Sequence, residues 1–459
     1  MRAALGGALR SSIQGKPTMS SAATPATATP NRGPYRLGIV GLGTVGMGVI
    51  RLLEENAELI ARRAGRPIQV VAISARDRTK DRGTDLSSYR WEDDMDALAL
   101  QDDVDAVVEL IGGSDGPALT LARNTLAAGK PFISANKAMI AHHGMELATI
   151  ADAADIPLKF EAAVAGGIPV IKALREGASA NRIARVYGIL NGTCNFILTK
   201  MEAEGRDFAD VLAEAQAKGF AESDPSFDID GIDAAHKLSI LAAMCFGTRL
   251  DFSAVATTGI RDILGADIRE AHALGYRVRL IGMAEQGENG LMQRVQPCLV
   301  PAEHPLGYVP GSLNAVVAEG NFVGRLFFEG AGAGDGPTAS AVVADIIDVA
   351  RDEYGPAFAM PVDQLETSVT ADAGSQRGKS YVRLLVQDRT GVLAQIAIAM
   401  RDAGVSVESF IQRGAQDGSA LIAMVTHECD ASAIATATTL LAQSPDILGQ
   451  PMRMPILTL

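Results

Sequence analysis

Cysteine and positive charge are both scarce in this sequence. The four cysteines stand alone, without a C-x-x-C pair or the His–Cys spacing that zinc sites need. Isolated thiols are typical of a reducing compartment, so we expect the protein to work in the cytoplasm. Acidic residues outnumber basic ones by 54 to 41, which gives a formal net charge of −13. The basic footprint of a nucleic-acid-binding protein is therefore missing.

Long hydrophobic runs are missing as well. No uninterrupted apolar segment reaches the roughly 18 residues that a membrane-spanning helix needs, so we expect no membrane-embedded part. What is present is the composition of a folded protein, with 47% hydrophobic and 21% charged residues. At roughly 100 to 200 residues per domain, the 459 residues have room for about two to four domains.

The first 33 residues differ from the rest of the chain. They hold four basic residues, no acidic residue, and many Ala, Thr, Ser, Pro and Gly, without hydrophobic periodicity. We therefore expect a disordered tail over residues 1–33. Two explanations of its composition stay open: a basic, acid-poor targeting segment, or a dispensable extension with Met19 as an alternative first residue.

Residues 34–160 show buried-type strands alternating with helices. The strands are expected at Arg36–Val40, Ile68–Ser74, Val104–Ile111 and Pro131–Ser134, with helices that end near Ala64 and Ala128. Continuous apolar strands separated by helices predict an α/β fold with a parallel, doubly wound sheet of the Rossmann type. We expect residues 331–353, which include an apolar helical run, to complete this domain.

Three further regions follow in the sequence. Residues 161–330 mix helices with strand-like segments such as Leu291–Val300, which predicts an α+β domain. Residues 354–377 are less regular, and we expect a linker there. Residues 378–459 show the order strand, helix, strand, strand, helix, strand. This βαββαβ order predicts a separate ferredoxin-like domain.

The sharpest local signal is a glycine-rich turn between the first strand and the first helix. In that context G-x-G-x-x-G indicates dinucleotide binding, because glycines permit close backbone approach and the helix N-terminus receives the pyrophosphate. A purely structural turn is the alternative. The candidate cofactor-binding residues of the turn are Gly41, Leu42, Gly43, Thr44, Val45 and Gly46.

The end of the second strand bears on the choice between NAD and NADP. An NAD site usually presents an acid there, which holds the ribose 2′-hydroxyl. This chain has Arg76, Arg78 and Lys80 around Asp77. Guanidinium groups bind phosphate in a bidentate fork, so we expect NADP, with Arg76 at the 2′-phosphate. Asp77 leaves NAD open, and a solvated basic loop is the alternative for the cations.

Two lysines are candidates for proton transfer. Lys237 follows Asp233 by four residues at the start of an apolar helix, so both project from one helix face. Lys137 lies just past a strand's C-terminal end, where open α/β sheets place ligand sites. A surface ion pair and an isolated surface lysine are the alternatives. If the two lysines converge, like charge lowers an ammonium pKa toward the range useful for catalysis.

Several segments together carry a family resemblance. They are the glycine fingerprint, Ser134–Lys137, Glu161–Pro169, Gly188–Asn195 and the acidic run that ends in Asp233-x-x-x-Lys237. In this order they resemble the homoserine dehydrogenases, over about Tyr35–Ala350. Near the C-terminus, Val386–Leu393 and Val405–Ser409 resemble the first strand, ligand turn and second strand of an ACT regulatory domain.

The resemblance implies roles in catalysis for five residues. Lys237 would be the proton donor and acceptor, with Lys137 assisting it near cofactor and substrate. Glu222 and Asp233 would hold the amino and hydroxyl ends of homoserine, and Asp228 would support them. In the family's terms residues 161–330 would be the catalytic and dimerisation domain.

The resemblance also implies cofactor, cation and effector sites. Ser114 and Gly336 would approach the cofactor. A monovalent cation, expected to be sodium, would bind Glu161 and backbone carbonyls of a nearby loop, those of Val164, Gly166 and Ile168. Cys194 occupies the variable place of an Asn-Gly-Thr-x-Asn motif. The effector, expected to be L-threonine, would bind the ACT turn at Asp388, Thr390, Gly391, Val392 and Leu393.

These expectations describe an NADP-preferring homoserine dehydrogenase. It would interconvert L-aspartate 4-semialdehyde and L-homoserine in threonine, methionine and isoleucine biosynthesis, as a homodimer or homotetramer inhibited by threonine. Two alternatives stay open. A semialdehyde-type aldehyde dehydrogenase would use Cys194 as a thiolate nucleophile, and a non-catalytic NADP-bound amino-acid sensor would use the same domains without proton transfer.

Overall fold

The first sheet is parallel throughout, as predicted. In this computed structural model, which describes residues 33–414 and 418–458, its strands lie in the order β3-β2-β1-β4-β5-β6, the 3-2-1-4-5-6 order of a Rossmann fold. The predicted tail falls outside the described residues except for Gly33. The strands are β1 (Tyr35–Val40), β2 (Ile68–Ser74), β3 (Arg90–Trp91), β4 (Ala106–Glu109), β5 (Phe132–Ser134) and β6 (Leu158–Lys159).

Helices cover this sheet, and one of them comes from far along the chain. The helix α11 packs on α1, and at Gly48 a Cβ would lie only 2.9 Å from the Asp335 carbonyl oxygen. The predicted single helix after the glycines breaks at Asn56 into two. The helices are α1 (Thr44–Glu55), α2 (Ala57–Ala64), α3 (Pro117–Ala127), α4 (Lys137–Ala154) and α11 (Asp335–Ala350).

The strand predicted at Val104–Ile111 is shorter in the structure. β4 ends at Glu109, whose buried carboxylate accepts hydrogen bonds from the backbone N–H groups of Ile111 (2.7 Å) and Gly112 (3.0 Å). This side chain turns the chain out of the sheet. It also accepts from Ser134 Oγ at the end of β5 (2.6 Å), so it ties two strand ends together at the edge where the cofactor is expected.

The second sheet has six strands in the order β12-β11-β7-β9-β10-β8. Its helix α9 lies against β7, β9 and β10, and its residues from Asp233 to Met244 are buried. The strands are β7 (Ile183–Ile189), β8 (Ala256–Thr257), β9 (Tyr276–Gly287), β10 (Gly290–Pro301), β11 (Leu313–Gly320) and β12 (Gly324–Ala331). The helices are α5 (Val170–Lys172) with a π-turn at Ala173–Gly177, α6 (Gly192–Glu204), α7 (Phe208–Ala217), α8 (Ser226–Ile229), α9 (Ile232–Phe246) and α10 (Gly265–Ala273).

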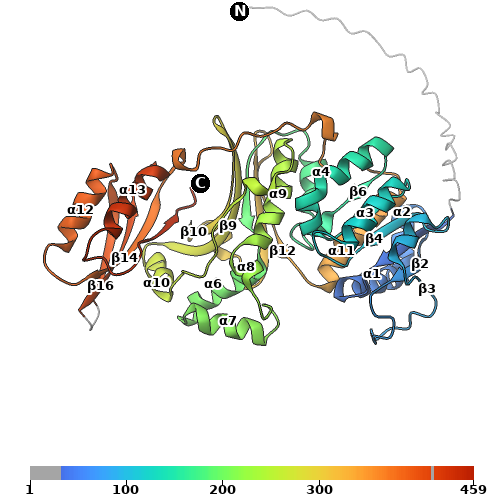
Figure 1. Cartoon of the computed structure of the whole chain (residues 1–459), viewed down its shortest axis with the longest axis horizontal. Helices are drawn as coiled ribbons and strands as arrows, with labels where there is room; N and C mark the ends of the chain where they lie inside the picture. The colour runs from blue at the N-terminus through green and yellow to red at the C-terminus, as the bar shows by residue number, and fades with distance from the viewer. Residues whose placement is uncertain (1–32, 415–417, 459) are drawn as a thin grey trace, which may run out of the picture. The chain divides into compact units, whose positions relative to one another are not determined.

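The third sheet is antiparallel and has the ferredoxin-like order β15-β16-β14-β18. Figure 1 shows α12 and α13 side by side on this sheet. The elements are β14 (Ser380–Gln387), α12 (Val392–Asp402), β15 (Val407–Gly414), β16 (Ser419–Thr426), α13 (Ala431–Ala442) and β18 (Met452–Pro455), with a small ladder of β13 (Arg377–Gly378) and β17 (Cys429–Asp430). The predicted fold class is confirmed for all three sheets.

The hydrophobic core continues from the second sheet into the third. Tyr381 and Met454 belong to the same buried cluster as the residues of α9. Beyond β18, the backbone N–H of Leu457 donates to the Leu299 carbonyl of β10 (2.8 Å), so the C-terminal segment spans both sheets. The segment expected as a linker is packed as well, because Phe358 is buried against Phe160 with ring centroids 5.3 Å apart.

Short 3₁₀ helices connect the larger elements at Met95–Leu100, Glu161–Ala163, Phe252–Ala254, Pro305–Tyr308, Val362–Gln364 and Ala373–Ser375. None of the helices in residues 33–414 and 418–458 combines the length and the apolar character that crossing a bilayer would take.

Candidate active site

Two lysine ammonium groups meet at one carboxylate. Lys237 Nζ donates to Asp233 Oδ2 (2.7 Å), and Lys137 Nζ lies 3.0 Å from Asp233 Oδ1. Asp233 and Lys237 occupy successive turns of α9, as their spacing predicts, whereas Lys137 is the first residue of α4, just beyond β5. The Rossmann sheet and the second sheet therefore contribute to the same cluster.

The three charges differ in exposure and in pKa. Burial lowers the pKa of Lys237, whereas the carboxylate of Asp233 raises that of Lys137. Burial opposes the ionisation of Asp233, but the two ammonium groups outweigh it and hold its pKa below the ordinary value. The Lys137 side chain is 34% exposed and that of Lys237 only 9%. Lys237 is thus the lysine more easily deprotonated, and Lys137 is the one open to solvent.

An asparagine joins the acids to the start of a helix. Asn191 Nδ2 donates to Asp228 Oδ1 and to Asp233 Oδ2, both at 2.8 Å. Its Oδ1 accepts the backbone N–H of Cys194 and so caps α6. Thr193 Oγ1 lies 3.2 Å from Asp228 Oδ2. Asn191 and Thr193 received no role from the sequence, although Asn before a helix is a typical N-cap.

Backbone groups complete the setting of Lys237. Its Nζ also donates to the Leu190 carbonyl (2.7 Å), which accepts a second hydrogen bond from Asn314 Nδ2 (2.9 Å). Burial and the neighbouring Asp233 raise the pKa of Asp228. Glu222 is exposed, and the hydrogen bond there is from Gln216 Nε2 to its backbone carbonyl (3.0 Å). The structure therefore gathers four of the five predicted catalytic residues and leaves the Glu222 side chain facing solvent.

Cys194 is unsuited to nucleophilic attack. It is fully buried, and its Sγ lies 3.2 Å from the Asp228 carbonyl oxygen. Burial raises the pKa of its thiol well above the ordinary value, and the neighbouring carboxylates add to the effect. A nucleophilic cysteine needs an accessible thiolate, so the alternative based on Cys194 loses its chemical basis.

Three glycines of the glycine-rich turn have different structural roles. Gly41 has φ +98°, and a Cβ there would lie 2.6 Å from the Leu110 backbone. At Gly46 a Cβ would lie 2.0 Å from the Gly41 carbonyl oxygen. At Gly43, the N-cap of α1, a Cβ would meet no atom within 4 Å. Gly41 and Gly46 thus close the turn, while Gly43 leaves open space at the helix N-terminus, where a pyrophosphate fits.

The basic loop after β2 is exposed, and Arg82, a residue without a role predicted from the sequence, holds it in place. Arg82 Nε donates to the Leu42 carbonyl in the glycine turn (3.1 Å), and its Nη2 to the Asp77 carbonyl (2.6 Å). The Asp77 carboxylate accepts from the backbone and hydroxyl of Thr79, which lower its pKa. Arg76 is exposed, so it can reach a ligand.

Two more predicted cofactor residues are Ser114, on the loop before α3, and Gly336, in the first turn of α11. Ser114 Oγ donates to Asp115 Oδ2 (2.7 Å), and its loop is tied to the start of α4 by Asn136 Nδ2, which donates to the Gly113 carbonyl (2.6 Å). A Cβ at Gly336, in the first turn of α11, would meet nothing within 4 Å. Space is thus open at the N-termini of both α1 and α11.

The predicted cation loop is built around a buried acid. The Glu161 carboxylate accepts the backbone N–H groups of Ile171 (2.9 Å) and Lys172 (2.8 Å). Burial and Asp345 raise its pKa to about 7. The next loop passes through Ala165 and Gly166 with φ +58° and +55°, and the Ile168 carbonyl accepts the Val170 N–H (2.7 Å). Between residues 33 and 458, outside 415–417, no cluster of three His, Cys, Asp or Glu could hold a metal, so a cation here would need backbone carbonyl oxygens in addition to Glu161.

The predicted effector turn precedes α12. Gly391 has φ +97° and is the N-cap of that helix. The backbone N–H of Asp388 donates to the Gly418 carbonyl (2.9 Å), and Arg389 pairs with buried Asp446 (2.5 Å). Asp388, Thr390 and Leu393 are exposed, whereas Val392 is buried in the domain core.

Comparisons with known protein families agree with this division of the chain. The model of the homoserine dehydrogenase family matches residues 169–347, and that of the homoserine dehydrogenase NAD binding domain matches residues 41–161. The ACT domain model matches residues 380–446.

Individual relatives match between 70% and 92% of this chain. A homoserine dehydrogenase of Pseudomonas aeruginosa is 44% identical over 411 residues, covering 88% of this chain and 94% of its own. The crystal structure of a homoserine dehydrogenase from Thiobacillus denitrificans has a TM-score of 0.87 at 41% identity, covering 92% and 98%. A hyperthermophilic archaeal homoserine dehydrogenase in complex with NADPH has a TM-score of 0.60 at 28% identity, covering 70% and 99%.

Proposed function

The chain belongs to the homoserine dehydrogenase family, oxidoreductases that act on a CH–OH group, and we propose that it interconverts L-aspartate 4-semialdehyde and L-homoserine with NADP as its preferred cofactor. The observation that carries the proposal is the meeting of Lys137 and Lys237 at Asp233, between the Rossmann sheet and the second sheet. A non-catalytic sensor has no need for a buried ammonium of lowered pKa.

The residues of this chain handle the proton of the reaction. When bound, the nicotinamide supplies hydride to the aldehyde carbon. Lys237 gives its proton to the developing alkoxide, directly or through a water that it orients, and takes it back in the reverse direction. Asp233 holds the Lys237 side chain by a hydrogen bond, and the more exposed Lys137 lies on the same carboxylate. Asp228 and Glu222 would help to bind homoserine.

The preference for NADP rests on the basic loop after β2. The Asp77 carboxylate is engaged by Thr79, so the 2′-position of a bound nucleotide would meet Arg76 and its basic neighbours. The archaeal relative in complex with NADPH is consistent with this choice. The open N-termini of α1 and α11, with Ser114 nearby, would hold the rest of the cofactor.

One assay tests both the reaction and the cofactor preference. Purified protein should reduce NADP when L-homoserine is added, and more efficiently than it reduces NAD. Arg76→Ala should raise KM for NADPH much more than KM for NADH, because it removes a contact to the 2′-phosphate. Arg63→Ala is the control, because Arg63 is an exposed arginine at the end of α2. No homoserine-dependent reduction would reject the function, and equal effects of Arg76→Ala on both cofactors would reject only the role of Arg76.

A monovalent cation, sodium by expectation, is part of the proposal. Glu161 and the carbonyls of Val164, Gly166 and Ile168 would line its site, because positive φ angles at Ala165 and Gly166 reverse the chain around the buried acid. Activity in sodium, potassium and a bulky organic cation at fixed ionic strength tests this. Equal activity in all three salts would remove the cation from the mechanism.

The proposal also includes an inhibitor, an oligomeric state, a pathway and a cellular location. L-threonine would bind the turn from Asp388 to Leu393 and inhibit the enzyme.

A homodimer or homotetramer would cover the edge strand β12, where Phe327 is exposed and Phe322 nearby is 90% exposed. The enzyme would serve threonine, methionine and isoleucine biosynthesis in the cytoplasm. The predicted domain limits of 34–160 with 331–353, 161–330 and 378–459 are kept as part of this proposal.

A further inference from the structure

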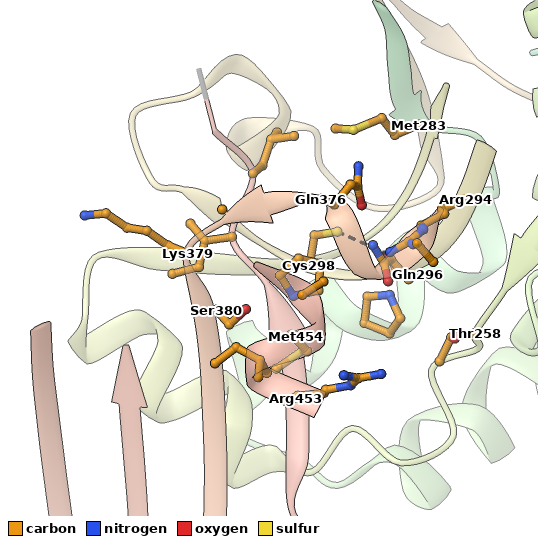
Figure 2. Close-up of a pocket in the computed structure, with 18 of the residues that line it drawn as sticks. Thr258, Met283, Arg294, Gln296, Cys298, Gln376, Lys379, Ser380, Arg453 and Met454 are labelled. Atoms are coloured by element: carbon orange, nitrogen blue, oxygen red, sulfur yellow. Dashed lines mark hydrogen bonds between the residues drawn. The ribbon is translucent and has the colours of Figure 1, made fainter. Parts of the chain in front are cut away.

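A cavity lies where the second and third sheets meet, and none of the three residues of the lysine cluster lines it. Its volume is about 620 Å³, within the roughly 300 to 1,000 Å³ typical of small-molecule sites. β9 and β10 form one wall, and β18 with the C-terminal segment forms another (Figure 2). None of the residues of the predicted threonine turn lines it, so this is a second, separate place for a ligand.

Three arginines that line this cavity, Arg294, Arg377 and Arg453, form no salt bridge within the described part of the chain. Arg294 comes from β10 and Arg453 from β18, and both are labelled in Figure 2. Two other lining cations are neutralised, because Arg185 pairs with Glu319 (2.6 Å) and Lys379 with Glu408 (2.5 Å).

The acids of the cavity do not neutralise these arginines. Asp262 and Glu285 also line it, but across the described part of the chain neither Arg294 nor Arg453 has a carboxylate oxygen within 4.0 Å. Arg294 is half-buried, and burial together with Arg453 lowers its pKa, although the charge of Asp372 partly opposes this shift. A partly desolvated cation that faces another cation is costly unless an anion joins them.

The rest of the lining suits an apolar body. Sulfur-containing residues from four strands line the cavity: Met283, Met292, Cys298, Cys429, Met452 and Met454. Methionine side chains adapt to ligands of irregular shape. The N-terminus of α13 also lies at the cavity, with Ala431 and Ser432 in the lining, and a helix N-terminus favours negative charge.

We propose that this cavity binds a small organic carboxylate with an apolar body, its carboxylate held between Arg294 and Arg453. Bound there, the ligand would join β10 of the second sheet to β18 of the third. It would therefore stabilise the folded chain and bias the contact between the two sheets. The inference does not depend on the proposed reaction, because it concerns binding alone.

Calorimetric titration of the full chain tests the proposal with four probes. They are 4-methylpentanoate, its neutral amide, L-leucine with the same carbon skeleton, and inorganic phosphate. We expect 4-methylpentanoate to bind at least tenfold more tightly than the amide, because only the acid carries the charge that the arginines lack. If L-leucine binds as well, the ligand of the cavity is an amino acid. If L-leucine does not bind, the ligand is a carboxylic acid without an amino group. Both results support the proposal. Equal binding of acid and amide, or binding of phosphate alone, would overturn it.

Variants of the two arginines test whether 4-methylpentanoate binds in the cavity. Arg453→Gln, at an exposed position, should fold normally and weaken 4-methylpentanoate binding at least tenfold, and Arg294→Gln should do the same. Arg401→Gln is the matched control, because Arg401 is an exposed arginine of α12 that pairs with its neighbour Asp402 outside the cavity. If Arg453→Gln binds 4-methylpentanoate as tightly as the unchanged protein, the site is not this cavity.

Discussion

At the scale of single residues, the site depends on one carboxylate serving two ammonium groups. Asp233 is 4% exposed, and a lone carboxylate so buried would favour its protonated form. Lys137, Lys237 and Asn191 each give it a charge or a hydrogen bond, so it stays ionised. In return, the charge of Asp233 opposes the burial that lowers the pKa of Lys237. This balance suits the role proposed for Lys237, which is to donate a proton in one direction and to accept it in the other.

Removing the Lys237 ammonium should stop turnover and spare the cofactor. Lys237→Met keeps an unbranched side chain, and loss of a general acid costs about 10² to 10⁴ in rate. We expect kcat to fall within that range while the dissociation constant for NADPH, measured by fluorescence, changes little. Lys218→Met, at an exposed position that pairs with Glu214, is the control. A kcat above about a tenth of the original would take Lys237 out of the mechanism.

Neutralising Asp233 should shift the pH profile of semialdehyde reduction. Asp233 raises the pKa of both lysines, so Asp233→Asn should lower both. The reduction needs a protonated lysine, and activity is lost as pH rises through its pKa. The alkaline limb of the kcat profile should therefore move to lower pH, along with a fall in kcat. Asp230→Asn, three residues away and paired with Arg261, should leave the limb in place; an unmoved limb in Asp233→Asn would disprove the coupling.

At the scale of elements, strand ends and helix starts build the site. Glu109 ends β4, Asn136 caps α4 so that Lys137 begins it, and Asn191 caps α6 beside the acids. Each of these polar side chains satisfies backbone N–H groups that a helix start or a strand end leaves free. The same hydrogen bonds that terminate the elements therefore hold the catalytic and cofactor loops in place.

Two glycines of one turn should respond differently to the same substitution. Gly43→Ala places a methyl group in open space at φ −82°, so the melting temperature should change little while KM for NADPH rises. Gly46→Ala drives a methyl group against the Gly41 carbonyl oxygen, and such overpacking costs about 1 to 3 kcal/mol of unfolding free energy. Thermal melts and cofactor titrations separate the two effects. If Gly43→Ala binds NADPH unchanged, the pyrophosphate does not lie against this residue.

At the scale of the whole chain, part of the third sheet packs into the same core as the second sheet, including Tyr381 and Met454. Buried Asp267 of α10 accepts hydrogen bonds from Tyr381 Oη (3.1 Å) and Arg383 Nε (2.7 Å) of β14. α10 in turn contacts α6, whose N-cap is Asn191 beside Asp233. A series of packed elements, β14, α10 and α6, therefore connects the third sheet to the residues around Asp233.

Threonine inhibition is best tested in the full chain. Deleting the third sheet would strip the partners of Asp267 and expose the apolar surface that Tyr381 and Met454 cover, so truncation should lower stability as well as regulation. Asp388→Ala, in the exposed turn, should instead weaken inhibition at least about tenfold, a coupling change of about 1.4 kcal/mol, with basal activity unchanged. Asp402→Ala in the same domain is the control. If the unchanged enzyme ignores millimolar threonine, the effector assignment is wrong.

Local patterns in the sequence determined the kinds of element and several of their functions. Period and composition are local properties, so the Rossmann strands, the βαββαβ order, the glycine turn and the pairing of Asp233 with Lys237 could all be predicted. The position of Lys137 after a strand end made it a candidate, and the family resemblance implied that it assists Lys237. The precise ends of β4 and of α1 could not be predicted, because Glu109 and Asn56 act through hydrogen bonds and backbone angles that periodicity does not encode.

Contacts between distant segments were decided by the tertiary structure alone. Lys137 and Asp233 meet at 3.0 Å although they are almost a hundred residues apart, and Asn314 of β11 donates to Leu190 at the end of the neighbouring strand β7. The burial of Cys194, the continuity of the core from α9 to Tyr381, and the unpaired arginines of the cavity follow from packing. Burial and charge pairing depend on which surfaces the fold brings together, and a linear pattern states only which residues are available.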